Sequence, residues 1–237
     1  MNEPIQYAVS TSIPSRSTGE AGDSELRRDI VAELCALLGD DVVLLPVQSG
    51  SKSPKIKNWQ TLTAEDMRRA EYRAELSRSG NVGVLLGNGL ITIDLDQDSA
   101  VKSFLVLNPK LSGTLRTRRV RGCNFWIRVE GPYPSSCKLF TITGEAFGEW
   151  RADKNQTVIH GEAIDRKKGE TVPTAYRIEN RAQPIKLSFE DIVWPKEVVL
   201  PWLEPVDFIG AANFDKLKTA YGEPFYLDRF GDPIHVK

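Results

Sequence analysis

The sequence predicts an α/β (α+β) fold in which helices and strands are arranged around a mixed sheet. Two observations lead to this class: helix-like and strand-like segments alternate early in the chain, and a run of short strand-like segments follows. The 237 residues are 41% hydrophobic and 27% charged, a composition typical of a globular protein. This length suits one large domain, or one domain with appendages.

The early part of the chain predicts two helices and one strand. Residues 1–24 are polar, with little apolar periodicity, and predict a flexible tail. Apolar residues then recur at helical spacing until Gly39, which favours the end of a helix. Further on, Thr63 is followed by acidic residues, as expected of an N-cap. The predicted elements are a helix over 25–38, a strand over 42–47, a loop over 48–58 and a helix over 63–77.

The later part predicts one more helix and a series of strands. Val82–Ile93 is rich in Val, Ile and Leu and predicts a buried strand that leads into Asp94. Pro109 is expected to end the next helix. The remaining elements are a helix over 99–108 and strands over 115–117, 124–129, 146–151, 157–160 and 174–179. We expect the compact domain to span 25–195, with a proline-rich extension over 196–237.

Membrane and secreted classes do not fit the sequence. It has no apolar run of transmembrane length and no secretory pattern at its N-terminus. Its three cysteines are scattered and lack metal-type spacing, which favours a reducing compartment. We therefore expect a cytoplasmic protein with no membrane partner. The formal charge of −1 decides nothing about nucleic acid, because local charge matters more than the total.

Asp94-Leu95-Asp96, at the end of a predicted strand, is the strongest candidate for chemistry. Residues two apart on a strand point to the same face, so Asp94 and Asp96 project together while Leu95 faces the core. Two neighbouring carboxylates are costly to keep ionised without a cation, and Mg²⁺ or Mn²⁺ suits such oxygen ligands. The alternative is an acidic turn at a strand end, where Asp is common.

Basic residues cluster in two segments. The loop containing Lys52 and Lys55 combines lysines with small residues, as phosphate recognition requires, but it lacks the Gly-Lys-Thr/Ser ending of a P-loop. Four arginines fall within six positions, namely Arg116, Arg118, Arg119 and Arg121. Taken alone, each cluster is more typical of a solvated surface than of a binding site.

The strand after the arginines predicts a polar face. Alternation places Asn124, Trp126 and Arg128 on one side, with Phe125 and Ile127 on the other. Such a face can hold a phosphate or stack on a base. An amphipathic strand with one side in solvent explains the pattern equally well.

A third group lies on the next two predicted strands. Glu149 and Arg151 share one face, and Glu149 can complete a metal site begun by Asp94 and Asp96 if the strands converge. His160 ends the following strand beside a glycine. A histidine in that position is more often structural than catalytic.

The order of these segments resembles the bifunctional DNA primase/polymerase (Prim-Pol) N-terminal domain of the archaeo-eukaryotic primase superfamily. The resemblance covers roughly residues 27–195 and implies the primase-polymerase mixed-sheet core. The matching segments are Gly50-Ser-Lys-Ser-Pro54 with Trp59-Gln60, Asn81–Gly87 with Asp94-Leu-Asp96, Thr117 with Arg121–Trp126, Glu149-Trp-Arg151 with Gln156–Gly161, and Tyr176.

The resemblance implies a role for each acidic residue. Asp94 and Asp96 match the pair that binds the divalent metals, Mg²⁺ or Mn²⁺, and Glu149 matches a third position that is more often Asp. Asn124 stands where the family typically has a histidine that contacts the phosphates of the incoming nucleotide. Asn can donate a hydrogen bond, but it cannot supply a positive charge or shuttle a proton.

The missing histidine has three explanations. His160 replaces it, nearby arginines replace it, or polymerisation is weakened. We favour Arg119 or Arg121 acting together with His160.

The implied chemistry is template-directed nucleotidyl transfer in the replication of a plasmid, phage or virus-like element. A 3′-hydroxyl attacks the α-phosphate of a nucleoside triphosphate, and pyrophosphate leaves. The expected partners are nucleoside triphosphates, a single-stranded DNA template and a fused or separate helicase. Candidate triphosphate ligands are Lys52, Lys55, Asn124, Arg151 and His160; candidate nucleic-acid ligands are Arg116, Arg118, Arg119, Arg121 and Arg128.

Two other functions fit the same residues. The first is a catalytically weak module that binds nucleotide or single-stranded DNA for a replicative helicase; Asn124 favours it, and the three acids argue against it. The second is metal-dependent phosphoester hydrolysis, which would use the same carboxylates. The chain's ending resembles the lead-in to a helicase domain, so we expect a piece of a longer replication protein.

Overall fold

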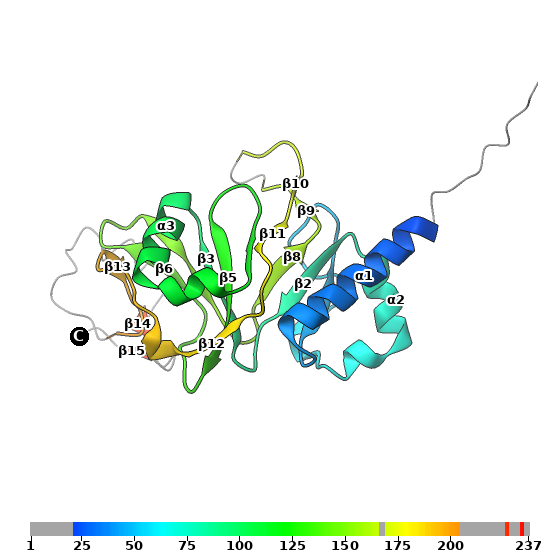
Figure 1. The fold of residues 1–237 in the computed structure, drawn as a ribbon, viewed down its shortest axis with the longest axis horizontal. Coiled ribbons are helices and arrows are strands. Elements are labelled where there is room, and N and C mark those ends of the chain that lie inside the picture. Colours follow the sequence, from blue (N-terminus) through cyan, green and yellow to red (C-terminus); the bar gives the residue numbers. More distant parts are fainter. Residues whose placement is uncertain (1–20, 166–168, 204–225, 228–232, 235–237) are drawn as a thin grey trace, which may run out of the picture.

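The computed structural model describes residues 21–165, 169–203, 226–227 and 233–234 of the chain. Within them, three α-helices pack around predominantly antiparallel sheets (Figure 1). The predicted α+β class is therefore confirmed. Most of the predicted tail, residues 1–20, lies outside the described residues.

The helices and strands follow one another closely along the chain. The α-helices are α1 (Ala21–Leu38), α2 (Ala70–Arg78) and α3 (Asp98–Leu107). Short 3₁₀ helices span Trp59–Thr61, Asp66–Arg68, Pro109–Gly113 and Phe189–Asp191. The strands are β1 (Val43–Val47), β2 (Asn81–Leu85), β3 (Leu90–Leu95), β4 (Arg116–Arg118), β5 (Cys123–Glu130), β6 (Cys137–Thr141), β7 (Ala146–Arg151), β8 (Gln156–His160), β9 (Glu162–Ala163), β10 (Thr174–Ala175), β11 (Arg177–Asn180), β12 (Ile185–Ser188), β13 (Val198–Val199), β14 (Tyr226–Leu227) and β15 (Pro233–Ile234).

Two sheets determine where the candidate site lies. The larger has eight strands in the order β11-β4-β5-β3-β7-β6-β13, with β12 pairing beside β5. The smaller has three strands in the order β1-β2-β8. The β12–β5 pair is parallel and the other pairs are antiparallel, which makes the large sheet mixed, as predicted.

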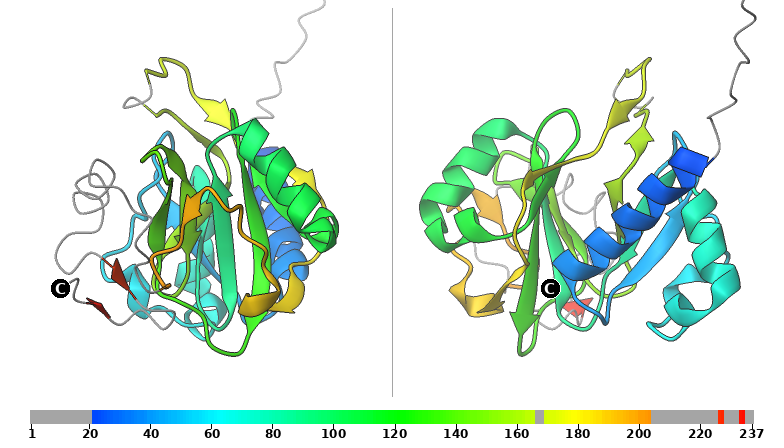
Figure 2. Two further views of the ribbon diagram at one scale, coloured as in Figure 1. Left: turned by 90° about the vertical axis from the view of Figure 1, so that its left-hand side faces the viewer. Right: turned by 45° about the vertical axis from the view of Figure 1, so that its right-hand side comes forward.

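Each face of the large sheet has its own core. Phe104 of α3 packs on one face with Ile93, Leu95 and Trp150. On the other face, Trp126 packs with residues of α1, α2 and the small sheet. Figure 2 shows α1 and α2 side by side and apart from α3. Strand alternation therefore decides which core a side chain enters, or whether it reaches the site between the sheets.

The predicted strand over Val82–Ile93 is two strands that belong to different sheets. β2 joins the small sheet and β3 the large one. Between them, Asn88 and Gly89 have φ values of 53° and 78°, in the left-handed region that turns require. The continuous apolar character hid this turn, because both strands are buried.

Thr63 is not the N-cap that the sequence suggested, because α2 begins later, at Ala70. The backbone N–H and the hydroxyl of Thr63 donate to the Asp66 carboxylate, at 2.8 Å and 3.1 Å. Asp66 thus caps a local turn that continues into a 3₁₀ helix. The acidic residue at this position bonds backward along the chain instead of favouring an α-helix.

The packed region continues past residue 195. β13 pairs with β6, and Trp202 is 4% exposed in the core beneath the large sheet. The predicted strand over 174–179 is also divided, since β10 pairs with β9 while β11 pairs with β4. The division of the chain at residue 195 stays a prediction, and most of the proposed lead-in to a helicase lies outside the described residues.

None of the described helices is both long enough and apolar enough to cross a bilayer.

Candidate functional site

The end of β3 presents two carboxylates on one face. Leu95 is fully buried in the core on the α3 side, while Asp94 and Asp96 both line a pocket. This is the alternation that the sequence predicted. The strand has a paired neighbour on each side here.

Both neighbours place a polar side chain beside Asp94. Asn124 of β5 and Glu149 of β7 are its direct cross-strand partners. Lys138 of β6 stands opposite Glu149 in turn. Residues opposite each other in an antiparallel pair have Cβ atoms about 4.5–5.5 Å apart, so these side chains form one row.

Two glycines allow the strands to meet so closely. A Cβ atom on Gly148 would lie 2.1 Å from the carbonyl oxygen of Asp94. A Cβ atom on Gly122 would lie 1.9 Å from the carbonyl oxygen of Leu95, and Gly122 also has a φ of 68°. Any other residue at either position would force the backbone apart.

The row opens into a pocket of about 480 Å³ between the two sheets. One wall is the large sheet and the opposite wall is β8. The hydroxyl of Thr157 on β8 lies 2.8 Å from the hydroxyl of Thr92 on β3. Loops complete the rim. The charged and polar lining residues are Lys52, Asp94, Asp96, Arg118, Arg119, Arg121, Asn124, Glu149, Arg151, Asn155, Gln156, Thr157, Glu170 and Tyr176.

Arg151 lies between two of the acids. Its Nη2 is 2.7 Å from Oδ2 of Asp94, and its Nε donates to Oε2 of Glu149 at 2.7 Å. Burial disfavours the charge on Arg151, but the two carboxylates outweigh this effect and raise its pKa. The guanidinium is therefore a permanent cation within the acidic row.

The oxygen atoms around Asp94 suit a divalent cation in type and in charge. Carboxylates of Asp94, Asp96 and Glu149 are hard ligands of the kind that Mg²⁺ and Mn²⁺ prefer. Oδ1 of Asn124 is buried and accepts no hydrogen bond from the described residues. With Arg151 included, the four charged side chains carry a formal charge of −2, because three are acidic and one is basic.

The acids do not yet form a metal cage. Among the described residues, no three Asp, Glu, His or Cys side chains converge on one point. Arg151 holds Asp94 and Glu149 instead. The donor chemistry therefore fits a divalent cation, while in this arrangement Asp94 and Glu149 are paired with Arg151.

Two cations at the rim are held by acids of the β9–β10 segment. Nζ of Lys52 is 3.0 Å from Oδ2 of Asp165. Arg119 makes a two-pronged contact with Glu170, in which Nη2 donates to Oε1 at 2.6 Å. The hydrogen bonds from Arg119 and from the backbone of Asp165 lower the pKa of Glu170. Arg121 is exposed and has no ion-pair partner among the described residues.

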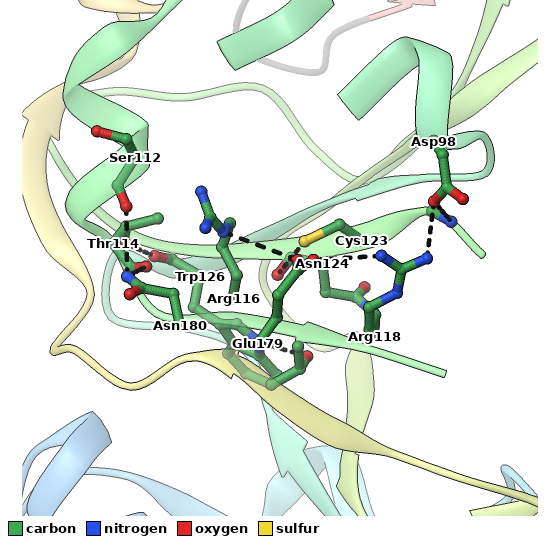
Figure 3. Close-up of polar contacts among 12 residues, drawn as sticks. Asp98, Ser112, Thr114, Arg116, Arg118, Cys123, Asn124, Trp126, Glu179 and Asn180 are labelled. Carbon is green, nitrogen blue, oxygen red and sulfur yellow. Dashed lines mark hydrogen bonds and ion pairs between the residues drawn. The ribbon is translucent and has the colours of Figure 1, made fainter. Parts of the chain in front are cut away.

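The members of the Arg116–Arg121 cluster differ in their contacts. Arg116 is opposite Phe125 and shares its side of the sheet, so it faces away from Asp94. Arg118 reaches the pocket rim but pairs with Asp98 at 2.8 Å and with Glu179 at 3.2 Å. Figure 3 shows Arg116, Arg118 and Glu179 gathered beside Cys123. Arg119 and Arg121 remain at the pocket.

Three other predicted ligands lie away from the pocket. Lys55 is 3.9 Å from Glu75 of α2. Arg128 pairs with Asp41 at the opposite end of β5. His160 ends β8 opposite Val82 and does not line the pocket.

Trp126 is not available to stack on a base. It is fully buried, and its indole N–H donates to the hydroxyl of Thr117 at 2.9 Å. The predicted alternation of β5 is correct, but beyond Asn124 its polar-looking face enters the second core. The sheet that covers this face could not be inferred from the strand alone.

Sequence analysis left several lining residues unassigned. Tyr176 belonged to the matching segments without a role, yet it lines the pocket, and burial raises its pKa to about 12. Glu170 and Asp165 gave no sequence signal, since isolated acids in a polar loop are common. Their long-range pairing with Arg119 and Lys52 reveals them.

Comparison with known proteins identifies one family. The family model described as bifunctional DNA primase/polymerase, N-terminal, matches residues 35–187, which is more than half of the chain. No curated protein matches the chain. The matched region contains β3, β5 and β7, and hence the whole row around Asp94.

Proposed function

We propose that this chain, which belongs to the bifunctional DNA primase/polymerase family, catalyses metal-dependent nucleotidyl transfer at the Asp94 pocket. The observation that carries the proposal is the row in which Asn124, Asp94 and Glu149 stand side by side on three paired strands. The row lies in a pocket that also contains Lys52, Arg119, Arg121 and Arg151. Acids and cations in one cavity suit a metal-bound triphosphate.

The acids and the cations would take different parts of the substrate. Asp94, Asp96 and Glu149 would hold Mg²⁺ or Mn²⁺, which would supply charge stabilisation at the reacting phosphate. Lys52 and Arg119 would bind phosphate oxygens after exchanging them for their present carboxylate partners. A 3′-oxygen would then bond to the α-phosphorus as the bond to pyrophosphate breaks.

The rim of the pocket would receive the nucleic acid. Arg121 is exposed there, and Arg118, at the end of β4, also lines the pocket. We propose single-stranded DNA as the template and a helicase, fused or separate, as a replication partner. Arg116 and Arg128 are left out of this surface because neither lines the pocket.

A primer-extension gel tests the proposal. Labelled nucleotides, a single-stranded template with or without a primer, and Mg²⁺ or Mn²⁺ are incubated with the protein. We expect the wild type to extend and the double variant Asp94→Ala, Asp96→Ala to be inactive. Glu130→Ala is the matched control, since it removes an exposed carboxylate from β5. Absence of extension by the wild type with either metal refutes the activity, and extension by the double variant refutes the site.

A binding module without efficient catalysis is the second candidate. Asn124 favours it, because a neutral amide replaces the expected histidine. The pairing of Lys52 and Arg119 with the chain's own acids favours it as well. This candidate predicts no extension product in the same assay, together with retention of labelled nucleotide or single-stranded DNA in a filter-binding measurement.

A further inference from the structure

Arg151 holds two of the carboxylates that a divalent metal would bind. It bridges the Asp94 and Glu149 carboxylates from one side with two contacts of 2.7 Å each. The side chain of Arg151 is 24% exposed and that of Asp94 is 25% exposed, so solvent screens this contact only partly. The guanidinium compensates the acids in the way that a bound cation would.

The ion pair and a metal would compete for the same carboxylates. Oδ2 of Asp94 and Oε2 of Glu149 contact Arg151, and a divalent cation bound to those oxygens would have to displace it. A cation bound to the other oxygen of each carboxylate would lie close to the guanidinium and would be repelled by it. In both arrangements Arg151, in its present position, opposes a metal shared by Asp94 and Glu149.

A released Arg151 needs a new anionic partner. A partly buried arginine without one would carry a desolvation cost. Within the described residues, the other acids that line the pocket are Asp96 and Glu170, and Glu170 already holds Arg119. A triphosphate in the pocket would supply several oxygens that match the planar fork of a guanidinium.

We infer that Arg151 is an exchange residue, which changes its partner when ligands bind. It holds the Asp94 and Glu149 carboxylates in the empty site. When a metal binds those carboxylates, Arg151 moves to the phosphates of the nucleotide. The inference rests on the proposed function. It implies that binding of the metal and binding of the nucleotide are coupled. A metal alone must displace Arg151 without compensation, and a nucleotide alone meets an arginine that is already paired. Each ligand thus makes binding of the other more favourable.

Calorimetric titration of the full chain tests this coupling. Mn²⁺ is titrated alone and in the presence of a non-hydrolysable nucleoside triphosphate, for the wild type and for Arg151→Gln. We expect the nucleotide analogue to tighten Mn²⁺ binding to the wild type by about 5- to 100-fold. Arg151→Gln should bind Mn²⁺ alone about tenfold more tightly than the wild type. The factor by which the nucleotide analogue tightens Mn²⁺ binding should fall towards one in this variant.

Two further variants separate exchange from a structural salt bridge. Arg151→Lys keeps the charge but not the two-pronged geometry, and should give intermediate Mn²⁺ affinity. Arg128→Gln breaks a comparable ion pair, with Asp41, away from the pocket, and should leave both affinities unchanged. In thermal unfolding, Arg151→Gln should lose stability without metal and regain more of it than the wild type when Mn²⁺ is added.

The outcomes distinguish this inference from the proposed function. If the wild type binds Mn²⁺ and extends primers while Arg151→Gln binds Mn²⁺ no more tightly, the exchange role is wrong and the function stands. If the wild type binds no Mn²⁺ with or without the nucleotide analogue, both are wrong. Unchanged coupling in Arg151→Gln also overturns the exchange role.

Discussion

Asn124 and Glu149 stand on opposite sides of the same residue, Asp94, on strands that pair with β3 from either edge. Asn124 contributes a buried amide oxygen that accepts no hydrogen bond from the described residues, and Glu149 contributes a carboxylate that is paired with Arg151. The two flanks of Asp94 therefore differ in charge and in whether their oxygen atoms are already paired.

Asn124 is expected to affect metal affinity directly. Asn124→Leu removes the amide oxygen at similar size, and should weaken Mn²⁺ binding by about tenfold. Asn124→Asp adds a charged oxygen ligand at nearly the same shape, and should strengthen it. Calorimetric titration without nucleotide measures both effects. Equal Mn²⁺ affinity in all three proteins, with weaker nucleotide binding in Asn124→Leu, would instead assign the side chain to the nucleotide.

Gly148 is expected to tolerate no side chain. In Gly148→Ala the new Cβ would lie 2.1 Å from the Asp94 carbonyl oxygen, so β7 and β3 must separate. We expect a loss of roughly 2–4 kcal/mol in the free energy of unfolding in urea. Gly113→Ala is the control, because a Cβ there meets no atom within 4 Å. Similar unfolding midpoints for the two variants would contradict the close approach.

Glu170 should make stability depend on pH in the acidic range. Hydrogen bonds from Arg119 and from the backbone of Asp165 lower its pKa, so its contribution is present above the ordinary glutamate value of about 4.3. It is lost as the pH falls through the lowered pKa. The melting temperature of Glu170→Gln should lie below that of the wild type at pH 7, and the two should converge at lower pH. A difference that persists in strong acid would contradict this linkage.

Arg121 should contribute to nucleic-acid binding, and Arg128 should not. Arg121→Ala removes an exposed cation at the pocket rim, so single-stranded DNA should bind several-fold more weakly, with the salt slope reduced by about one. Fluorescence anisotropy at several salt concentrations measures both quantities. Arg128→Ala serves as control because Arg128 pairs with Asp41 outside this pocket. If the two substitutions changed single-stranded DNA binding equally, the proposal that DNA binds at the pocket rim would be contradicted.

Local alternation made much of the site predictable. The facing of Asp94 against Leu95, and of Glu149 with Arg151, follows from strand geometry and is confirmed by the place of Leu95 in the core and by the contacts of Arg151 with both acids. The mixed sheet followed in the same way from the order of the elements. These predictions succeeded because side-chain direction on a strand depends only on neighbouring residues.

Long-range pairing was not predictable. Lys52 and Asp165 are 113 positions apart, and no local pattern announces their contact. The burial of Trp126 depends on the small sheet and helices that cover β5. Arg116 looked equivalent to Arg119 and Arg121, but its strand position turns it away from Asp94. In each case the deciding partner comes from a distant part of the chain.

The aromatic cluster under the large sheet extends past the family match. Trp150 stands between Glu149 and Arg151 in the chain and points into the opposite core, where its ring meets Phe189 at 5.1 Å and Trp194 and Trp202 at 6.2 Å each. All three partners lie beyond residue 187, where the family match ends. A chain shortened to that match would leave Trp150 without these packing partners, directly behind the acidic row. We therefore expect that a shortened version of this protein has to reach at least residue 202 to keep the acidic row in place.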